Sequence, residues 1–163
     1  MLRYLWLSLV VIVLDQAGKW WVQSELLPHD RVEVLPFFNL TLVFNQGAAF
    51  SFLSDAGGWQ RYLFIGLALV VSLVLVIWLA RLAADEHRLA LGLALILGGA
   101  VGNLIDRLWW GHVVDFLDFH WRFWHWPAFN LADSAITLGV VLLLLDGLLG
   151  QRGRREAGER DDV

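Results

Sequence analysis

The feature that most constrains this chain is an uninterrupted apolar run from Tyr62 to Ala80. Its 19 residues carry no charged side chain, and Arg61 and Arg81 flank it. A helix needs about 20 mainly apolar residues to cross the hydrocarbon core of a bilayer. The composition agrees, because 58% of the 163 residues are hydrophobic and only 17% are charged, against about a quarter in an ordinary soluble domain. The run therefore predicts a membrane-spanning helix.

Three further apolar stretches have the length of a span. Together with the first, the predicted spans lie at about 4–21, 62–80, 89–105 and 128–149. The polar, Gly/Arg/Glu-rich residues 151–163 predict a disordered tail. The expected organisation is a single membrane-embedded domain over 1–150, followed by that tail.

The uncharged stretch 34–54 is long enough to cross a membrane but has a different pattern. It contains Pro36 and several amides, and part of it alternates between apolar and other residues. Such a two-residue period predicts strands, and an isolated strand in lipid would leave backbone groups unpaired. We therefore expect a paired hairpin at the membrane surface. The apolar positions of the alternation are Phe38, Leu40, Leu42 and Phe44.

The distribution of Lys and Arg predicts the orientation. With four spans both termini lie on one side, which then holds seven of the 12 Lys and Arg residues; the other five are spread over far more residues. Short cytoplasmic segments are enriched in Lys and Arg, so we expect both termini in the cytoplasm. Eight of the ten Trp residues then fall at the outer face, where aromatic side chains concentrate.

Composition and motifs exclude several classes of function. A net charge of −4 excludes a strongly basic nucleic-acid binder, and the absence of Cys excludes disulfides, thiol nucleophiles and Cys-ligated metals. The sequence has no HExxH, no Gly-x-Ser-x-Gly and no Walker loop. His112, Asp115, Asp118, His120 and His125 match no zinc spacing. We expect neither a metal nor a cofactor.

Charged residues within spans need a physical reason, because a carboxylate at a helix centre costs about 2.5–3.5 kcal/mol. Asp15 precedes Lys19 by one turn, the favourable order for an ion pair, and we interpret the two as a structural pair near the outer interface. Asp106 and Arg107 are interpreted as an interfacial pair that fixes a helix end. Asp146, about a turn from the cytoplasmic end, is expected to reach water.

Asp133 and Asp115 are different, because neither has a local cation to explain it. Ile136 and Thr137 occupy the positions one turn after Asp133, and Asp115 lies in an apolar run on the loop between the third and fourth spans. Two carboxyls in one pocket of low dielectric share a proton, which supplies a base and an acid for attack by water. A polar contact between helices is the structural alternative for Asp133.

The third span also carries residues that bear on packing and on the site. Gly98 and Gly102 form a small-xxx-small pair, which allows close helix approach in lipid. Asn103 follows directly and is expected to reach a pocket.

Five motifs occur in a familiar order and cover about Asp15 to Asp146. They are Asp15-Gln16 with Lys19, Asn45-Gln46-Gly47-Ala48-Ala49-Phe50, Gly98-Gly99-Ala100 through Gly102-Asn103 to Asp106-Arg107, Val113-Val114-Asp115-Phe116, and Phe129-Asn130-Leu131-Ala132-Asp133. In these motifs the chain resembles the bacterial lipoprotein signal peptidases (signal peptidase II), which are integral-membrane aspartyl peptidases, and most of all the proteobacterial members.

The resemblance implies a mainly α fold, a four-transmembrane-helix bundle. It adds a small extracytoplasmic β-sheet cradle, from about 32–53 plus part of 107–126, and a short periplasmic helix near Ser54 to Trp59. It implies that Asp115 and Asp133 are the catalytic pair. The expected supporting residues are Asn45, Gly47, Asn103, Arg107, Asn130 and Ala132, and the expected structural polar residues are Asp15, Lys19 and Asp106.

The implied substrate is a prolipoprotein whose lipobox Cys already carries a diacylglyceryl group, cut just before that Cys. We expect a monomer in the bacterial inner membrane, in contact with lipid and with its site near the periplasmic face. Two alternatives remain: a proton-coupled transporter that uses both carboxyls as a relay, and a non-catalytic scaffold that packs through Gly98 and Gly102.

Overall fold

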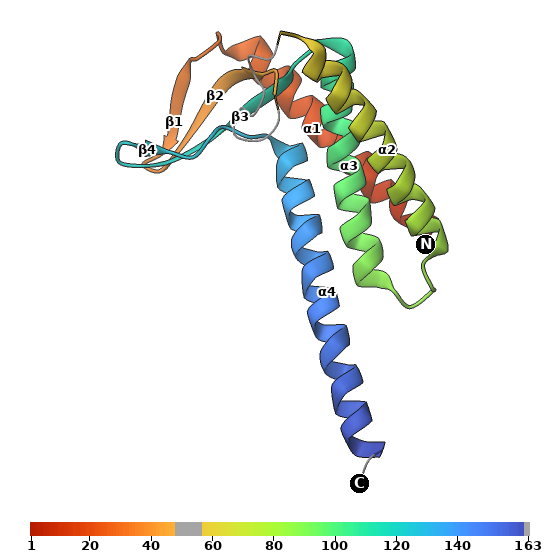
Figure 1. The fold of residues 1–163 in the computed structure, drawn as a ribbon. Coiled ribbons are helices and arrows are strands. Elements are labelled where there is room, and N and C mark those ends of the chain that lie inside the picture. Colours follow the sequence, from red (N-terminus) through yellow and green to blue (C-terminus); the bar gives the residue numbers. More distant parts are fainter. Residues whose placement is uncertain (48–56, 162–163) are drawn as a thin grey trace.

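The computed structural model describes residues 1–47 and 57–161, with side chains as far as Leu148. Long helices form a bundle, and a small sheet lies at one end of it (Figure 1). In chain order the elements are η1 (Leu2–Tyr4), α1 (Leu5–Glu25), β1 (Arg31–Leu35), β2 (Phe38–Asn45), α2 (Trp59–Arg81), α3 (His87–Trp109), β3 (Val113–Trp121), β4 (Trp124–His125) and α4 (Leu131–Asp161). The predicted fold class is confirmed.

Four helices among the described residues are long and apolar enough to cross a membrane. Their candidate spans are Leu2–Glu25, Trp59–Arg81, His87–Trp109 and Leu131–Leu148. The fourth span starts at Leu131 rather than at 128, because Asn130 caps the helix there. α4 also continues to Asp161, where the sequence predicts a disordered tail. That segment is rich in Arg and Glu, which are good helix formers.

α3 is the central helix and packs against α1, α2 and α4. Small residues make this possible. A Cβ at Gly98 would collide with Ser8 and Val11 of α1, and one at Gly99 would collide with the Ala132 carbonyl of α4. The predicted role of Gly98 and Gly102 in close packing is confirmed, since a Cβ at Gly102 would also lie only 2.7 Å from Asp15 of α1, and Gly99 adds the approach to α4.

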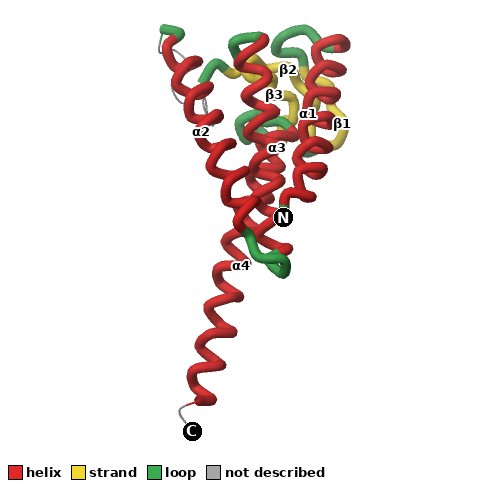
Figure 2. The backbone as a smooth tube through the Cα atoms, turned by 90° about the vertical axis from the view of Figure 1, so that its right-hand side faces the viewer, coloured by secondary structure: helices red, strands yellow, loops and turns green. Residues whose placement is uncertain are grey.

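The strands form one antiparallel sheet in the order β1-β2-β3-β4. It lies where α1 ends and α4 begins, opposite the α2–α3 turn (Figure 2). Val22 of α1 packs with Leu42 of β2 and with Val114 and Phe116 of β3, so the last turns of α1 cover one face of the sheet. β3 is thereby fixed against α1 on one side and leads toward α4 on the other.

The predicted hairpin is present as β1 and β2, but its polar side is not open to solvent. Asn39 and Thr41 are buried, because Asn39 donates to Asp118 and Thr41 donates to the Asp30 carbonyl. The first half of the short helix expected near Ser54 to Trp59, residues 54–56, lies outside the described residues. Gly57 and Gly58 form a turn before α2.

Candidate active site

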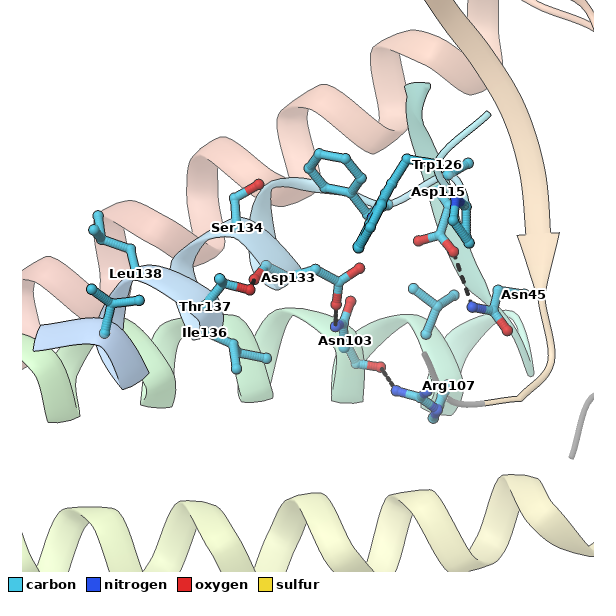
Figure 3. A pocket seen from close by; sticks show the side chains of 15 residues that line it. Asn45, Asn103, Arg107, Asp115, Trp126, Asp133, Ser134, Ile136, Thr137 and Leu138 are labelled. Atoms are coloured by element: carbon cyan, nitrogen blue, oxygen red, sulfur yellow. Dashed lines mark hydrogen bonds between the residues drawn. The ribbon is translucent and has the colours of Figure 1, made fainter. Parts of the chain in front are cut away.

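A cavity of about 730 Å³ opens where the start of β3, the C-terminal part of α3 and the N-terminus of α4 meet. Its polar lining comes from Asn45, Asn103, Arg107, Asp115 and Asp133, and apolar side chains of α4 extend it along that helix (Figure 3). Residues from four separate elements therefore converge on one space.

The start of α4 places Asp133. Asn130 is the residue before the helix, and its Oδ1 accepts the N–H of Asp133 at 2.9 Å. Asp133 Oδ2 in turn lies 3.4 Å from the N–H of Asn130. This reciprocal arrangement is a capping box, and an anion at a helix N-terminus is stabilised by the exposed N–H groups and the helix dipole. Asp133 therefore has a fixed position at the start of α4.

Asp115 is held on β3, opposite Val43 of β2. Its carboxyl accepts hydrogen bonds from Asn45 Nδ2 at 3.0 Å and from Asn130 Nδ2 at 2.7 Å. Burial, and then the negative charge of Asp133, raise the pKa of Asp115 to about 7, although the two amide donors oppose the shift. Asp115 is thus a carboxyl that changes protonation near neutral pH.

Two amides connect the carboxyls. Asn130 Nδ2 donates to Asp115 Oδ1 and lies 3.2 Å from Asn103 Oδ1. Asn103 Nδ2 donates to Asp133 Oδ1 at 2.8 Å. The structure brings together Asp115 and Asp133 in one hydrogen-bonded network, and no salt bridge reaches either carboxyl among the described residues.

Arg107 supplies positive charge to the cavity without a direct ion pair. Its guanidinium donates to the Gly47 carbonyl at 2.9 Å and to the Asn103 carbonyl at 3.3 Å, and it lies over the ring of Phe64. It also interacts electrostatically with both cavity carboxylates. Gly47 contributes its backbone alone: the carbonyl to Arg107 and the N–H to Asn45.

A second charged cluster, the Lys19 cluster, lies beside the cavity and consists of Lys19, Asp15 and Asp106. Lys19 Nζ is 2.7 Å from Asp15 and 2.8 Å from Asp106, and the three side chains are only 2%, 0% and 1% exposed. The predicted Asp15–Lys19 pair is present; it is fully buried within the protein, and it includes a second carboxylate.

The expected Asp106–Arg107 pair is not formed. Asp106 accepts from Lys19, from Gln16 Nε2 at 2.7 Å and from the Val114 N–H at 3.1 Å, whereas Arg107 faces the cavity. Consecutive helical residues point about 100° apart, so one faces α1 and the other the site. Ala132 is likewise placed by the cluster, since its N–H donates to Asp15 at 2.9 Å.

The His and Asp residues at the far end of β3 form a structural group. Asp118 accepts from Asn39 and contacts His125 Nδ1 at 2.9 Å, and His125 stacks on His120. Burial opposes ionisation of Asp118, but the hydrogen bonds from Asn39 and His125 outweigh it and lower the pKa of that carboxyl. Within the described ranges no three His, Asp or Glu side chains are placed to hold a metal ion.

Sequence reasoning missed two residues at the site. Gln16 bonds Asp106 and the Gly102 carbonyl, and Trp126 lines the cavity. For Gln16 a signal existed, because a polar residue inside an apolar helix needs a buried partner just as Asp15 does. For Trp126 the signal was ambiguous, because Trp is also expected at any membrane interface.

Comparison with known proteins agrees with this geometry. A family model described as signal peptidase (SPase) II matches residues 7–149. The lipoprotein signal peptidase of Pseudomonas fluorescens is 55% identical over 147 residues, which is 89% of this chain and 86% of that protein. The one from Shewanella sediminis is 49% identical over 162 residues, which is 99% of this chain and 92% of that protein.

Among solved structures, a bacterial membrane enzyme determined by the in meso method superposes with a TM-score of 0.83 at 31% identity. The match covers 91% of this chain and 89% of that one. Similarity of this extent in both sequence and fold shows that the chain belongs to the signal peptidase II family, a family of membrane proteases.

Proposed function

We propose that this chain is an intramembrane aspartyl endopeptidase that removes the signal peptide from diacylglyceryl-modified prolipoproteins, just before the lipidated Cys. Asp115 and Asp133 are the catalytic residues in this proposal. Its chief support is a single observation: two carboxyls, with no salt-bridge partner among the residues that the structure describes, lie in one cavity and are joined through Asn103 and Asn130. The name of the relatives supports the class of substrate.

The environments of the two carboxyls suggest different roles. Asp133, at the N-terminus of α4, is the ionised base and takes a proton from water as the oxygen attacks the scissile carbonyl carbon. Asp115, with its pKa near 7, is the acid and gives its proton to the carbonyl oxygen. When the C–N bond breaks, a proton passes to the amine nitrogen. The reaction needs neither a covalent intermediate nor a cofactor.

The cavity has the chemistry expected for a lipidated peptide. Asn45, Asn103 and Arg107 offer donors and acceptors to a peptide backbone, and Ile136, Leu138 and Val141 continue the lining along α4 with apolar surface. In a bilayer this apolar side would face acyl chains. A monomer with substrate and lipid as its partners satisfies these requirements.

The proposed location is the bacterial inner membrane, with both termini in the cytoplasm and the site near the periplasmic face. A reporter after Val163 and one between Asp85 and Glu86 should both report cytoplasm, whereas one inserted within 55–58 should report the outer side. If the reporters at Asp85 and within 55–58 report the same side, the four-span orientation is wrong.

The deciding experiment is cleavage of a synthetic diacylglyceryl prolipopeptide by the purified full chain in detergent, followed by mass spectrometry. We expect one cut, directly before the modified Cys, and none in the same peptide without the lipid. Detergent abolishes any proton gradient, so cleavage there excludes a transporter as the source of the activity. Absence of cleavage by folded protein would refute the proposal.

A matched pair of variants separates catalysis from a scaffold role. The Asp133→Asn protein should fold but lose its cleavage activity, since the base is gone. Asp146 lies outside the cavity, so the Asp146→Asn protein should remain active. A folded Asp133→Asn protein with normal cleavage would contradict the aspartyl mechanism.

A further inference from the structure

Lys19 is a fully buried cation to which the proposed chemistry gives no role. Its three ammonium protons have three acceptors: Asp15 Oδ2 at 2.7 Å, Asp106 Oδ2 at 2.8 Å and Asn103 Oδ1 at 3.0 Å. An ammonium group has only three donors. Lys19 is therefore saturated by the protein and cannot bind substrate directly, so any influence on the reaction must pass through these three partners.

The two carboxylates of the Lys19 cluster each hold the residue before a cavity Asp. Asp15 Oδ1 accepts the N–H of Ala132, which precedes Asp133. Asp106 Oδ2 accepts the N–H of Val114, which precedes Asp115. Lys19 binds both carboxylates at once. Because one carboxylate holds the start of α4 and the other holds β3, Lys19 sets the position of these two segments relative to each other.

The third partner fixes an amide. Asn103 Oδ1 faces Lys19 Nζ and Asn130 Nδ2, both of which are donors. Its Nδ2 is thereby left to donate to Asp133. The reversed amide would place an NH₂ group against the ammonium and an oxygen against the carboxylate, and both contacts are repulsive. Lys19 thus decides which end of Asn103 meets the base.

We propose that Lys19 is a positioning residue for peptide cleavage, which sets the spacing between the two catalytic segments through Asp15 and Asp106 and the orientation of the Asn103 amide toward Asp133. The inference rests on the proposed function and deepens it. It differs from a purely structural ion pair because it predicts an effect on kcat in protein that is fully folded.

Electrostatics adds a second, independent consequence. The charged groups that face Asp115 are Asp133 on α4, Arg107 on α3 and Lys19 on α1. Burial and Asp133 raise the pKa of Asp115, and the positive charge of Lys19 opposes that rise. Asp115 acts as the acid, so the alkaline limb of the pH–rate profile should follow the net charge of the cluster.

The test compares Lys19→Met with Asp15→Asn in purified full chain that cleaves a diacylglyceryl peptide. Lys19→Met removes the cation and the donor to Asn103. We expect kcat to fall about 100-fold, the effect of about 1 Å of misplacement, while KM changes less than about twofold. Its alkaline limb should move to higher pH. Asp15→Asn retains an acceptor for Ala132 but removes one negative charge from the cluster, so its limb should move to lower pH.

Each outcome has one meaning. If wild-type protein does not cleave, the proposed function fails. If wild type cleaves and folded Lys19→Met keeps its kcat, the positioning role alone is overturned, as it is if both variants move the limb in the same direction.

If Lys19→Met does not fold, the neutral triple variant Asp15→Asn, Lys19→Met, Asp106→Asn replaces it, since it leaves no unpaired buried charge. We expect folded triple variant with low kcat and near-normal KM. Normal kcat in the triple variant, or its failure to fold, would overturn the proposal in favour of a role in holding the bundle alone.

Discussion

Two pairs of carboxylates lie next to each other in this molecule, and they differ in what accompanies them. Asp15 and Asp106 enclose the ammonium of Lys19 and are closed off from solvent. Asp115 and Asp133 have neutral amides between them and line an open cavity. Both pairs have the same functional groups. A cation between two carboxylates neutralises their charges, so the group serves as a structural element. Two carboxyls without a cation between them share a proton instead and can exchange it with water.

The largest effect is expected from a change in the pair that lines the cavity, Asp115 and Asp133. Asp115→Asn removes the acid, and cleavage should fall by about 10³-fold or more. The measurement is the initial rate on a diacylglyceryl peptide, with unchanged thermal unfolding as evidence of fold. Asp146→Asn is the matched control on α4 and should keep most of the activity. A large loss there would mean that Asp146 also takes part in function.

The next largest effect is expected from a change in the buried pair, Asp15 and Asp106, which encloses Lys19. Asp15→Ala removes one of the two carboxylates that hold the buried Lys19 ammonium and leaves the Ala132 N–H without its acceptor, at a cost of about 3–5 kcal/mol in the free energy of unfolding. The sequence alone suggests that Asp15→Leu with Lys19→Leu restores stability. The structure changes that expectation, because Asp106 would then be unpaired.

The neutral triple variant Asp15→Asn, Lys19→Met, Asp106→Asn should therefore be more stable than the double Leu variant. Unfolding curves in one detergent decide the order. A double Leu variant as stable as the triple variant would show that Asp106 does not depend on Lys19.

A third experiment sharpens the comparison through pH. Asp115 must be protonated to act as the acid, and its pKa is about 7, so kcat should fall above pH 7 by about tenfold per unit. The same raised pKa means that ionised Asp115 costs stability, so its contribution to folding becomes less favourable as pH rises from about 4 through 7. Rates measured from pH 5 to 9 test the first statement. A constant kcat up to pH 9 would contradict the assignment of Asp115 as the acid.

The smallest effect concerns the packing that supports the buried pair. A Cβ at Gly18 would lie 3.2 Å from the tip of the Phe116 ring, which can shift slightly. Gly18→Ala gains about 0.8–1 kcal/mol in helix propensity, so the net change should be within about 1 kcal/mol. Gly99→Ala is the contrasting variant, because the Ala132 backbone blocks its Cβ, and overpacking there should cost about 1–3 kcal/mol. Equal stability of the two variants would contradict this.

The parts that sequence predicts well are those with a local signal. The four spans follow from apolar runs, strand β2 from alternation, and the Asp15–Lys19 pair from one helical turn of spacing. The isolation of Asp115 and Asp133 was also visible, because each lacks a cation nearby in the chain. The family resemblance supplied their pairing and the supporting residues beyond what those local signals carry.

The parts that sequence does not predict depend on contacts between distant segments. Asp106 was assigned to its neighbour Arg107, whereas its partner Lys19 lies on another helix. The depth of the Lys19 cluster was missed for the same reason, since α3, β3 and α4 together bury it. Such burial depends on which helix faces approach each other, and Gly98 and Gly99 permit that approach without specifying what it encloses.

The reciprocal cap at the start of α4 restricts how this protein can change in length. The side chains of Asn130 and Asp133 each accept the backbone N–H of the other and so cap the start of α4. Asn130 also donates a hydrogen bond to Asp115. Insertion or deletion of a single residue between them would rotate Asp133 by about 100° and leave the helix end uncapped. Length variation among homologous chains should therefore accumulate in the β3–β4 turn or beyond Leu148, while the three-residue step from Asn130 to Asp133 stays constant.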